Sequence, residues 1–93
     1  MSFSVDPGHP ALPGHFPGRP VVPGVMLLER VLAAIESAQG PVATLRLPQV
    51  KFVRPLLPGE QARVELERVE PERWRFRVLR DDGALLASGE ART

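Results

Sequence analysis

The sequence contains no cysteine, which excludes disulfides, thiolate metal sites and a cysteine nucleophile. The net charge is also small. Twelve basic and eleven acidic residues leave a net charge of +1, too little to hold a polyanion such as nucleic acid. No apolar run is long enough to cross a membrane, and residues 1–10 lack the basic and apolar regions of a signal peptide. We therefore expect a cytoplasmic, soluble protein with no nucleic-acid partner and no membrane insertion.

Proline, by contrast, is abundant and unevenly placed. Six of the eleven prolines fall between Pro7 and Pro23, so this segment cannot form regular secondary structure. The segment is short, contains apolar residues such as Leu12 and Phe16, and leads directly into an apolar helix. These features favour an ordered loop over a disordered linker.

The rest of the chain predicts one helix followed by strands. Residues 25–38 (VMLLERVLAAIESA) have helical composition, with Pro23 suited to the first turn and Gly40-Pro41 to the end. This helix is apolar around most of its circumference, so we expect the protein to wrap it. Alternation and turn signals predict strands at residues 2–5, 42–53, 62–69, 73–80 and 84–91, with a tight hairpin at residues 81–83.

Two details of the predicted sheet concern its faces and edge. Pro48 inside the first long strand indicates an edge position or a bulge. Arginines at 73, 75 and 77 alternate with an apolar face, and Glu65 and Glu67 alternate likewise on the preceding strand. Cross-strand charge pairing explains this basic face more simply than a nucleic-acid surface. Residues 1–93 are expected to form a single α+β domain, small enough that a dimer interface would help to stabilise it.

Residues 14–25 (GHFPGRPVVPGV), followed by Glu29, contain the most specific motif. They resemble the FabZ/FabA-type 3-hydroxyacyl-[acyl-carrier-protein] dehydratases, which carry a histidine-phenylalanine-proline-glycine turn, a proline-glycine at the central helix and an acid on that helix. Lys51-Phe52, Arg54-Pro55 and residues 58–60 resemble a second motif of that family, and residues 87–91 are also similar. The compact chain, with His9-Pro10 followed by Leu12 and Gly14, looks more like the small ApeI-like dehydratases of aryl polyene pathways than like the longer housekeeping enzymes.

The resemblance implies a dimeric hot-dog fold, in which a curved antiparallel sheet wraps one central helix. It also implies dehydration of a (3R)-3-hydroxyacyl thioester on acyl-carrier protein to the trans-2-enoyl thioester, without cofactor or metal, in fatty-acid or polyene-type biosynthesis. His15 would be the base, since its ordinary pKa is about 6.5. Glu29 of the partner subunit would be the acid, favoured in its protonated form by apolar neighbours. The Gly24 amide, at the positive helix end, would hold the oxyanion.

The same resemblance suggests residues that contact the substrate and its carrier. The family has an acyl tunnel at its dimer interface. Basic side chains near the mouth of this tunnel would receive either an acidic carrier protein or the phosphates of coenzyme A; the candidates are Arg19, Arg46, Lys51 and Arg54. The acyl chain is expected to contact Phe16, Val21, Val22, Val25 and Met26.

Three alternatives remain beside this hypothesis. A non-catalytic acyl-binding or partner subunit of a hot-dog heterodimer would use the same fold without turnover. A hot-dog thioesterase would activate water against the carbonyl carbon instead. A metal site at Asp6, His9 and His15 is disfavoured, because these ligands are few and loosely spaced. A homodimer and a heterodimer with a related chain are both compatible with the sequence.

Overall fold

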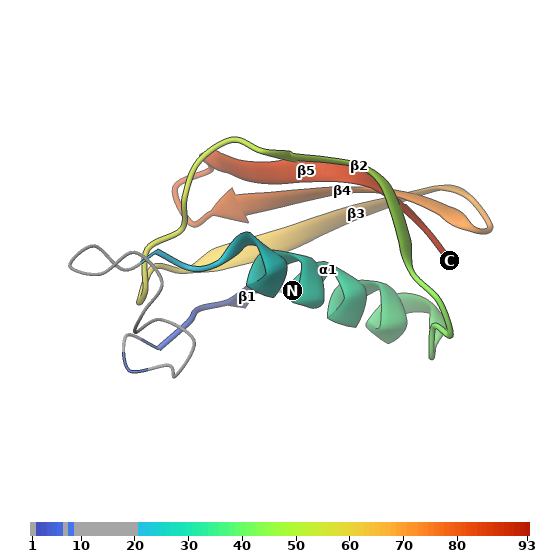
Figure 1. Ribbon diagram of the computed structural model, residues 1–93, viewed down its shortest axis with the longest axis horizontal. Helices are drawn as coiled ribbons and strands as arrows, with labels where there is room; N and C mark the ends of the chain where they lie inside the picture. The colour runs from blue at the N-terminus through green and yellow to red at the C-terminus, as the bar shows by residue number, and fades with distance from the viewer. Residues whose placement is uncertain (1, 7, 9–20) are drawn as a thin grey trace.

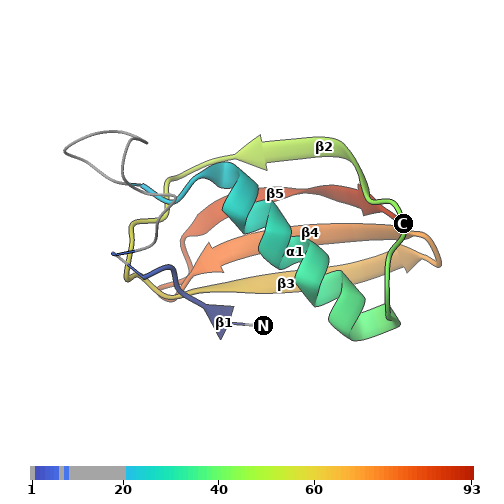
Figure 2. The ribbon, with the colours of Figure 1, turned by 60° about the horizontal axis from the view of Figure 1, so that its bottom comes forward.

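The computed structural model describes residues 2–6, 8 and 21–93, and shows one helix lying across one face of a five-stranded antiparallel sheet (Figures 1 and 2). The sheet order is β1-β3-β4-β5-β2, so that β1 and β2 form its two edges. The elements are β1 (Ser2–Phe3), α1 (Gly24–Gln39), β2 (Arg46–Phe52), β3 (Ala62–Glu70), β4 (Arg73–Arg80) and β5 (Leu85–Arg92). No helix in the described part of the chain is long and apolar enough to cross a membrane.

Helix α1 confirms the sequence prediction to within one residue at each end. It begins directly after Pro23 and ends where Gly40 adopts a φ of 94°, a conformation that glycine adopts readily. The Gly40 amide donates a hydrogen bond of 2.8 Å to the Glu36 carbonyl. A side-chain oxygen of the same glutamate accepts a bond of 3.1 Å from the Val42 amide, which directs the chain back toward the sheet.

Only one side of α1 is covered within the described chain. Its buried residues, Leu27, Val31, Ala34 and Ile35, face the sheet. The opposite side exposes Val25, Glu29 and Ala33, which are spaced four apart and therefore form one stripe. The sequence predicted a helix wrapped on most of its circumference, whereas this single chain leaves the Val25 side open.

Strands β3, β4 and β5 form the regular part of the sheet. On β4 the side chains of Trp74, Phe76 and Val78 are buried beneath the helix, as their alternation predicted. The arginines between them lie on the outer face, where Arg77 opposes Glu65 and binds it at 2.5 Å. The predicted cross-strand charge pairing is therefore confirmed at this position.

Strand β2 differs from the prediction in length but not in its irregularity. We expected residues 42–53 to be extended, yet the strand starts only at Arg46, because residues 40–45 carry the chain from the helix end to the sheet (Figure 1). The pairing register with β5 shifts between Arg46 and Gln49, around Pro48. The edge position and the bulge predicted from that proline are both present.

Close packing fixes β2 onto β5 at Gly89. A Cβ atom at this position would collide with the backbone carbonyl of Gln49 and lie 2.8 Å from the ring of Phe76. Glycine is therefore required where the edge strand, β5 and the buried aromatic ring meet.

A polar cluster connects the far end of the helix to the turn between β3 and β4. The indole nitrogen of Trp74 donates to the side-chain oxygen of Gln39 at 3.2 Å. The guanidinium of Arg68 stacks 5.0 Å from the Trp74 ring centroid and donates at 2.7 Å to the Pro71 carbonyl. These contacts hold the C-terminal end of α1 against the sheet.

The hairpin between β4 and β5 forms as expected. Gly83 adopts a φ of 91°, and the Arg80 amide bonds the Ala84 carbonyl at 2.8 Å. The Arg80 side chain donates two hydrogen bonds to Asp82, and the Ala84 amide donates a third. The bonds from Arg80, followed by the bond from Ala84, lower the pKa of the Asp82 carboxyl to about 2.

Candidate active site

The N-terminal end of α1 has no side-chain cap among the described residues. Pro23 precedes the helix with an extended backbone (φ −57°, ψ 139°), and no side chain of the described part of the chain caps the first turn. The first turn also contains no acidic residue. Amides at this end therefore point away from the helix at its positive pole, where an acceptor from outside the helix would be favoured.

Gly24, the predicted oxyanion donor, lies against an aromatic ring. A Cβ atom on Gly24 would come within 2.7 Å of both Cε1 and Cζ of Phe52, so the ring packs directly on the glycine backbone. The contact leaves the predicted role of the Gly24 amide untested, and it places the Phe52 ring beside the first residue of α1.

Phe52 is the residue that sequence reasoning missed as part of this site. Its side chain remains 53% exposed although it lies at the end of β2. The Lys51-Phe52 motif marked the position, but a contact between residues 24 and 52 cannot be read from one sequence. The ring covers the Gly24 backbone while one side of it faces solvent.

An apolar groove opens at this junction of helix and edge strand. It has a volume of about 400 Å³, and Arg54 is its only charged residue in the described part of the chain. The groove is lined by Val21, Val22, Pro23, Gly24, Leu27, Phe52, Val53, Arg54, Pro55 and Leu56. An apolar groove of this kind suits a hydrocarbon chain rather than a polar ligand.

The predicted acyl contacts are placed differently from one another. Val21 and Val22 line the groove, and the Val22 amide also bonds the Leu56 carbonyl at 2.8 Å, which ties this segment to the loop after β2. Val25 is 61% exposed on the open side of the helix, and Met26 packs against the core. The structure thus brings two of these four residues into one groove.

Glu29 lies on the open side of α1 and does not line the groove. Five residues at about 100° each place it roughly 140° around the helix from Gly24. It is exposed in the described chain, between Val25 and Ala33 along the helix. A single subunit therefore presents Gly24 and Glu29 to different surroundings. His15, Phe16 and Arg19 lie outside the described residues.

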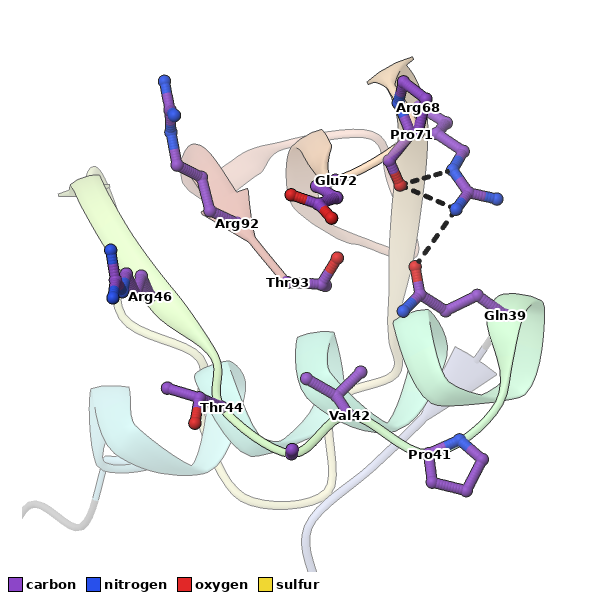
Figure 3. A pocket seen from close by; sticks show the side chains of 11 residues that line it. Gln39, Pro41, Val42, Thr44, Arg46, Arg68, Pro71, Glu72, Arg92 and Thr93 are labelled. Atoms are coloured by element: carbon purple, nitrogen blue, oxygen red, sulfur yellow. Dashed lines mark hydrogen bonds between the residues drawn. The ribbon is translucent and has the colours of Figure 1, made fainter.

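The three described basic residues that were expected near the mouth of the acyl tunnel do not form one group. Arg54 lines the apolar groove, and Lys51 lies on the outer face of β2. Arg46 lies near the other end of the sheet, in a basin of about 760 Å³ that Arg92 and the helix end at Gln39 also line (Figure 3). The described residues contain no cluster of three or more histidine, aspartate or glutamate side chains suited to a metal ion.

Comparison with known protein families identifies the family of this chain. The model of the ApeI-like family, described as ApeI dehydratase, matches residues 1–90. The chain belongs to the ApeI-like dehydratase family. Two curated relatives are named 3-hydroxyacyl-[acyl-carrier-protein] dehydratase FabZ. The one from Granulibacter bethesdensis is 38% identical over 80% of this chain, and the one from Symbiobacterium thermophilum is 36% identical over 75%. The aligned regions cover 51% and 55% of those proteins, so the chain matches about half of their length.

Solved structures support the same fold. The dehydratase heterocomplex ApeI:P from Xenorhabdus doucetiae superposes with a TM-score of 0.83 at 26% identity, over 98% of this chain and 81% of that one. An uncharacterised protein from Erwinia carotovora gives 0.76 at 28% identity, over 98% and 77% of the two chains. The predicted α+β hot-dog fold is confirmed.

Proposed function

We propose that this chain dehydrates a (3R)-3-hydroxyacyl thioester carried by acyl-carrier protein to the trans-2-enoyl thioester, in fatty-acid or polyene-type biosynthesis. The observation that carries the proposal is the uncapped start of α1 at Gly24, which opens onto an apolar groove in a chain of the ApeI-like dehydratase family. An acyl chain in the groove would bring its thioester carbonyl toward the positive end of the helix.

The proposed chemistry divides among three groups. His15 takes the proton from C2, and the resulting negative charge develops on the thioester oxygen, which the Gly24 amide receives. Glu29 of the partner subunit donates a proton to the C3 hydroxyl, which leaves as water while the C2–C3 double bond forms. The product retains its thioester, and no oxidant or cofactor is consumed.

Two subunits are required by this assignment. Glu29 lies roughly 140° around the helix from Gly24, so the acid of one chain does not face the groove of the same chain. The exposed stripe of α1 that contains Glu29 also contains Val25, which is 61% exposed, and so offers apolar surface for a second subunit to cover. Such covering would desolvate Glu29, as a general acid requires. The partner is a second copy or a related chain, as in the ApeI:P heterocomplex of Xenorhabdus.

Phe52 has a defined place in the proposed reaction. Because its ring packs on the Gly24 backbone, it would form a wall beside a thioester whose carbonyl is bound by the Gly24 amide. Its side chain is about half exposed, which leaves room for rotation about χ1. We therefore assign Phe52 as a residue that positions the thioester.

The test follows formation of the conjugated 2-enoyl product from a 3-hydroxyacyl-carrier-protein substrate. His15→Ala and Glu29→Gln should each lower turnover by roughly a hundredfold or more. His9→Ala and Glu67→Gln are the matched controls and should retain activity. If the chain forms homodimers, mixing the two inactive variants should restore about a quarter of wild-type activity, because random exchange gives half mixed dimers with one intact site each.

Two outcomes would contradict the proposal. Full turnover in Glu29→Gln would remove the acid from its role. No turnover of the wild-type chain, either alone or with a related subunit, on carrier-protein and coenzyme A substrates would favour the non-catalytic acyl-binding subunit. Release of free thiol without enoyl product would instead identify a thioesterase.

A further inference from the structure

A basin of about 760 Å³ lies at the end of the sheet away from the apolar groove at Gly24 (Figure 3). It is bounded by the end of α1, the segment that leads into β2, the turn between β3 and β4, and the end of β5. Gln39, which lines it, is the last residue of α1 and so lies roughly 22 Å along the helix from Gly24. The basin and the groove have no lining residue in common, so a ligand of the basin would be separate from an acyl chain at Gly24 of the same chain.

Two arginines face each other at the rim of this basin. Arg46 begins β2 and lies directly opposite Arg92, the last residue of β5. Both side chains are exposed, and both lie on the same side of the basin (Figure 3). Neither forms an ion pair with any of the eleven acidic side chains of the sequence, all of which are described. Because like charges directly opposite on adjacent strands repel, this pair destabilises the start of β2 unless an anion lies between the two guanidiniums.

The next arginine in the same row binds the carboxylates beside it. Arg73 of β4 lies opposite Arg92 on its other side, and it forms ion pairs with Glu70 and Glu90. Three arginines therefore lie in one row across β4, β5 and β2, and only the one on β4 has carboxylate partners among the described side chains. The charges of Arg92 and Arg46 are left without compensation from those side chains.

The basin contains one further cation and one side-chain carboxylate. Arg68 stacks on Trp74 and donates to the Pro71 carbonyl at 2.7 Å, so these contacts fix its guanidinium at the basin wall. Glu72 also lines the basin, but it forms no ion pair with a described arginine. Three guanidiniums against one side-chain carboxylate make this surface cationic, which favours an anion as its ligand.

The backbone attaches the start of β2 only weakly to β5. The register shifts between Arg46 and Gln49, so that Leu47 and Pro48 occupy the span of one β5 residue. Such a bulge interrupts the ladder of hydrogen bonds, and proline has no amide hydrogen to donate. A ligand that bridges Arg46 and Arg92 would hold the edge strand to β5 where the ladder is interrupted.

We propose that Arg46 and Arg92 form a binding site for a phosphate group. Each guanidinium offers a planar fork of donors, and a tetrahedral dianion has enough oxygens to accept from both forks, whereas a carboxylate has only two. The charge of a phosphate group, close to −2 at neutral pH, would offset both arginines. The same basin is lined by the hydroxyl of Thr44, a further donor, and by Pro41 and Val42, which could contact the organic part of a phosphate ester.

Phosphate binding would raise the thermal midpoint of the full chain. At fixed protein concentration and constant ionic strength, about 50 mM phosphate should raise the wild-type midpoint by at least about 3 °C relative to chloride. Arg46→Gln and Arg92→Gln should each lose most of this rise. Without phosphate, both variants should unfold at or above the wild-type midpoint, because the repulsion between the arginines is gone. Residues that only support the fold would instead lower the midpoint in both buffers.

Arg75→Gln is the matched control, since it removes the same charge from an exposed arginine on the outer face of β4. It should keep the full rise, and it corrects for the general stabilisation that phosphate gives to folded proteins. Glu72→Gln should enlarge the rise, because the carboxylate that lines the basin competes with the ligand.

Amide chemical shifts locate the site and identify the kind of ligand. Titration of the labelled chain with inorganic phosphate should move the amide signals of residues 44–46 and 91–93 and leave those of Lys51 and Arg77 in place. Phenyl phosphate carries the same group on an apolar body. If it binds at least about fivefold more tightly than inorganic phosphate, the ligand is a phosphate ester, and equal affinity identifies the free ion.

Two results would overturn the proposal. The first is an equal rise of the thermal midpoint in the wild-type chain and in both arginine variants. The second is a set of shift changes centred on Lys51 or Arg54 instead of Arg46 and Arg92. Neither result bears on dehydration, because the basin and the apolar groove are lined by different residues.

Discussion

Strands β3, β4 and β5 contrast with the part of the molecule formed by β2 and the start of α1. In the first region, buried side chains lie under the helix and charged side chains pair across strands. In the second, within the described chain, the start of the helix has no side-chain cap and Phe52 is half exposed. The basic side chains there, Arg46, Lys51 and Arg54, form no ion pair with a described carboxylate. The first region is complete within one chain, whereas the second leaves groups uncovered that the proposed function assigns to a substrate and a second subunit.

The largest expected effect separates the two regions by stability. Phe76 is 1% exposed beneath the helix, and replacing it with alanine should lower the free energy of unfolding by about 3–5 kcal/mol. Phe52→Ala should cost much less, because its ring is 53% exposed. Urea denaturation measures both. Equal losses would show that the edge region is as much a part of the core as β4.

A second prediction concerns Gly24. Gly24→Ala places a Cβ within 2.7 Å of the Phe52 ring, so overpacking should cost about 1–3 kcal/mol, and turnover should fall. Adding Phe52→Ala removes the clash and should recover most of the stability. A double-mutant cycle from denaturation curves measures the coupling. Additive losses in the cycle would show that the ring and the glycine do not press on each other.

The smallest effect lies in the hairpin of the complete region. Because Arg80 and Ala84 lower the pKa of Asp82 to about 2, from an ordinary value near 3.9, its contribution is present above pH 4. Protonation removes it as the pH falls toward 2. The thermal midpoint of wild type should therefore drop more between pH 4 and pH 2 than that of Asp82→Asn. Parallel curves for the two proteins would assign the acid sensitivity elsewhere.

The complete region could largely be predicted from the sequence, for a local reason. Helix composition, strand alternation and turn residues act within a few positions, so α1, β4 and the Gly83 hairpin were predicted closely. The start of β2 was misjudged, because residues 42–45 are sterically suited to a strand but are needed to span from helix to sheet.

The open region could be predicted only in part. The motif indicated Gly24 and the apolar residues that follow the proline loop, and Val21 and Val22 do line a groove. The packing of Phe52 on Gly24 and the separation of Arg46 from Arg54 depend on contacts between distant parts of the chain, which one sequence does not specify. The roles of His15, Glu29 and Gly24 in catalysis stay predictions.

The glycine at position 89 carries a consequence for how this protein changes over time. A side chain there would push the Gln49 backbone away from β5, and so detach β2. The helix and strands β3 to β5 would still share their buried side chains. Descendants with such a change would keep a folded domain yet lose the wall of the apolar groove that Phe52 contributes, so that folding and the proposed substrate site depend on separate positions.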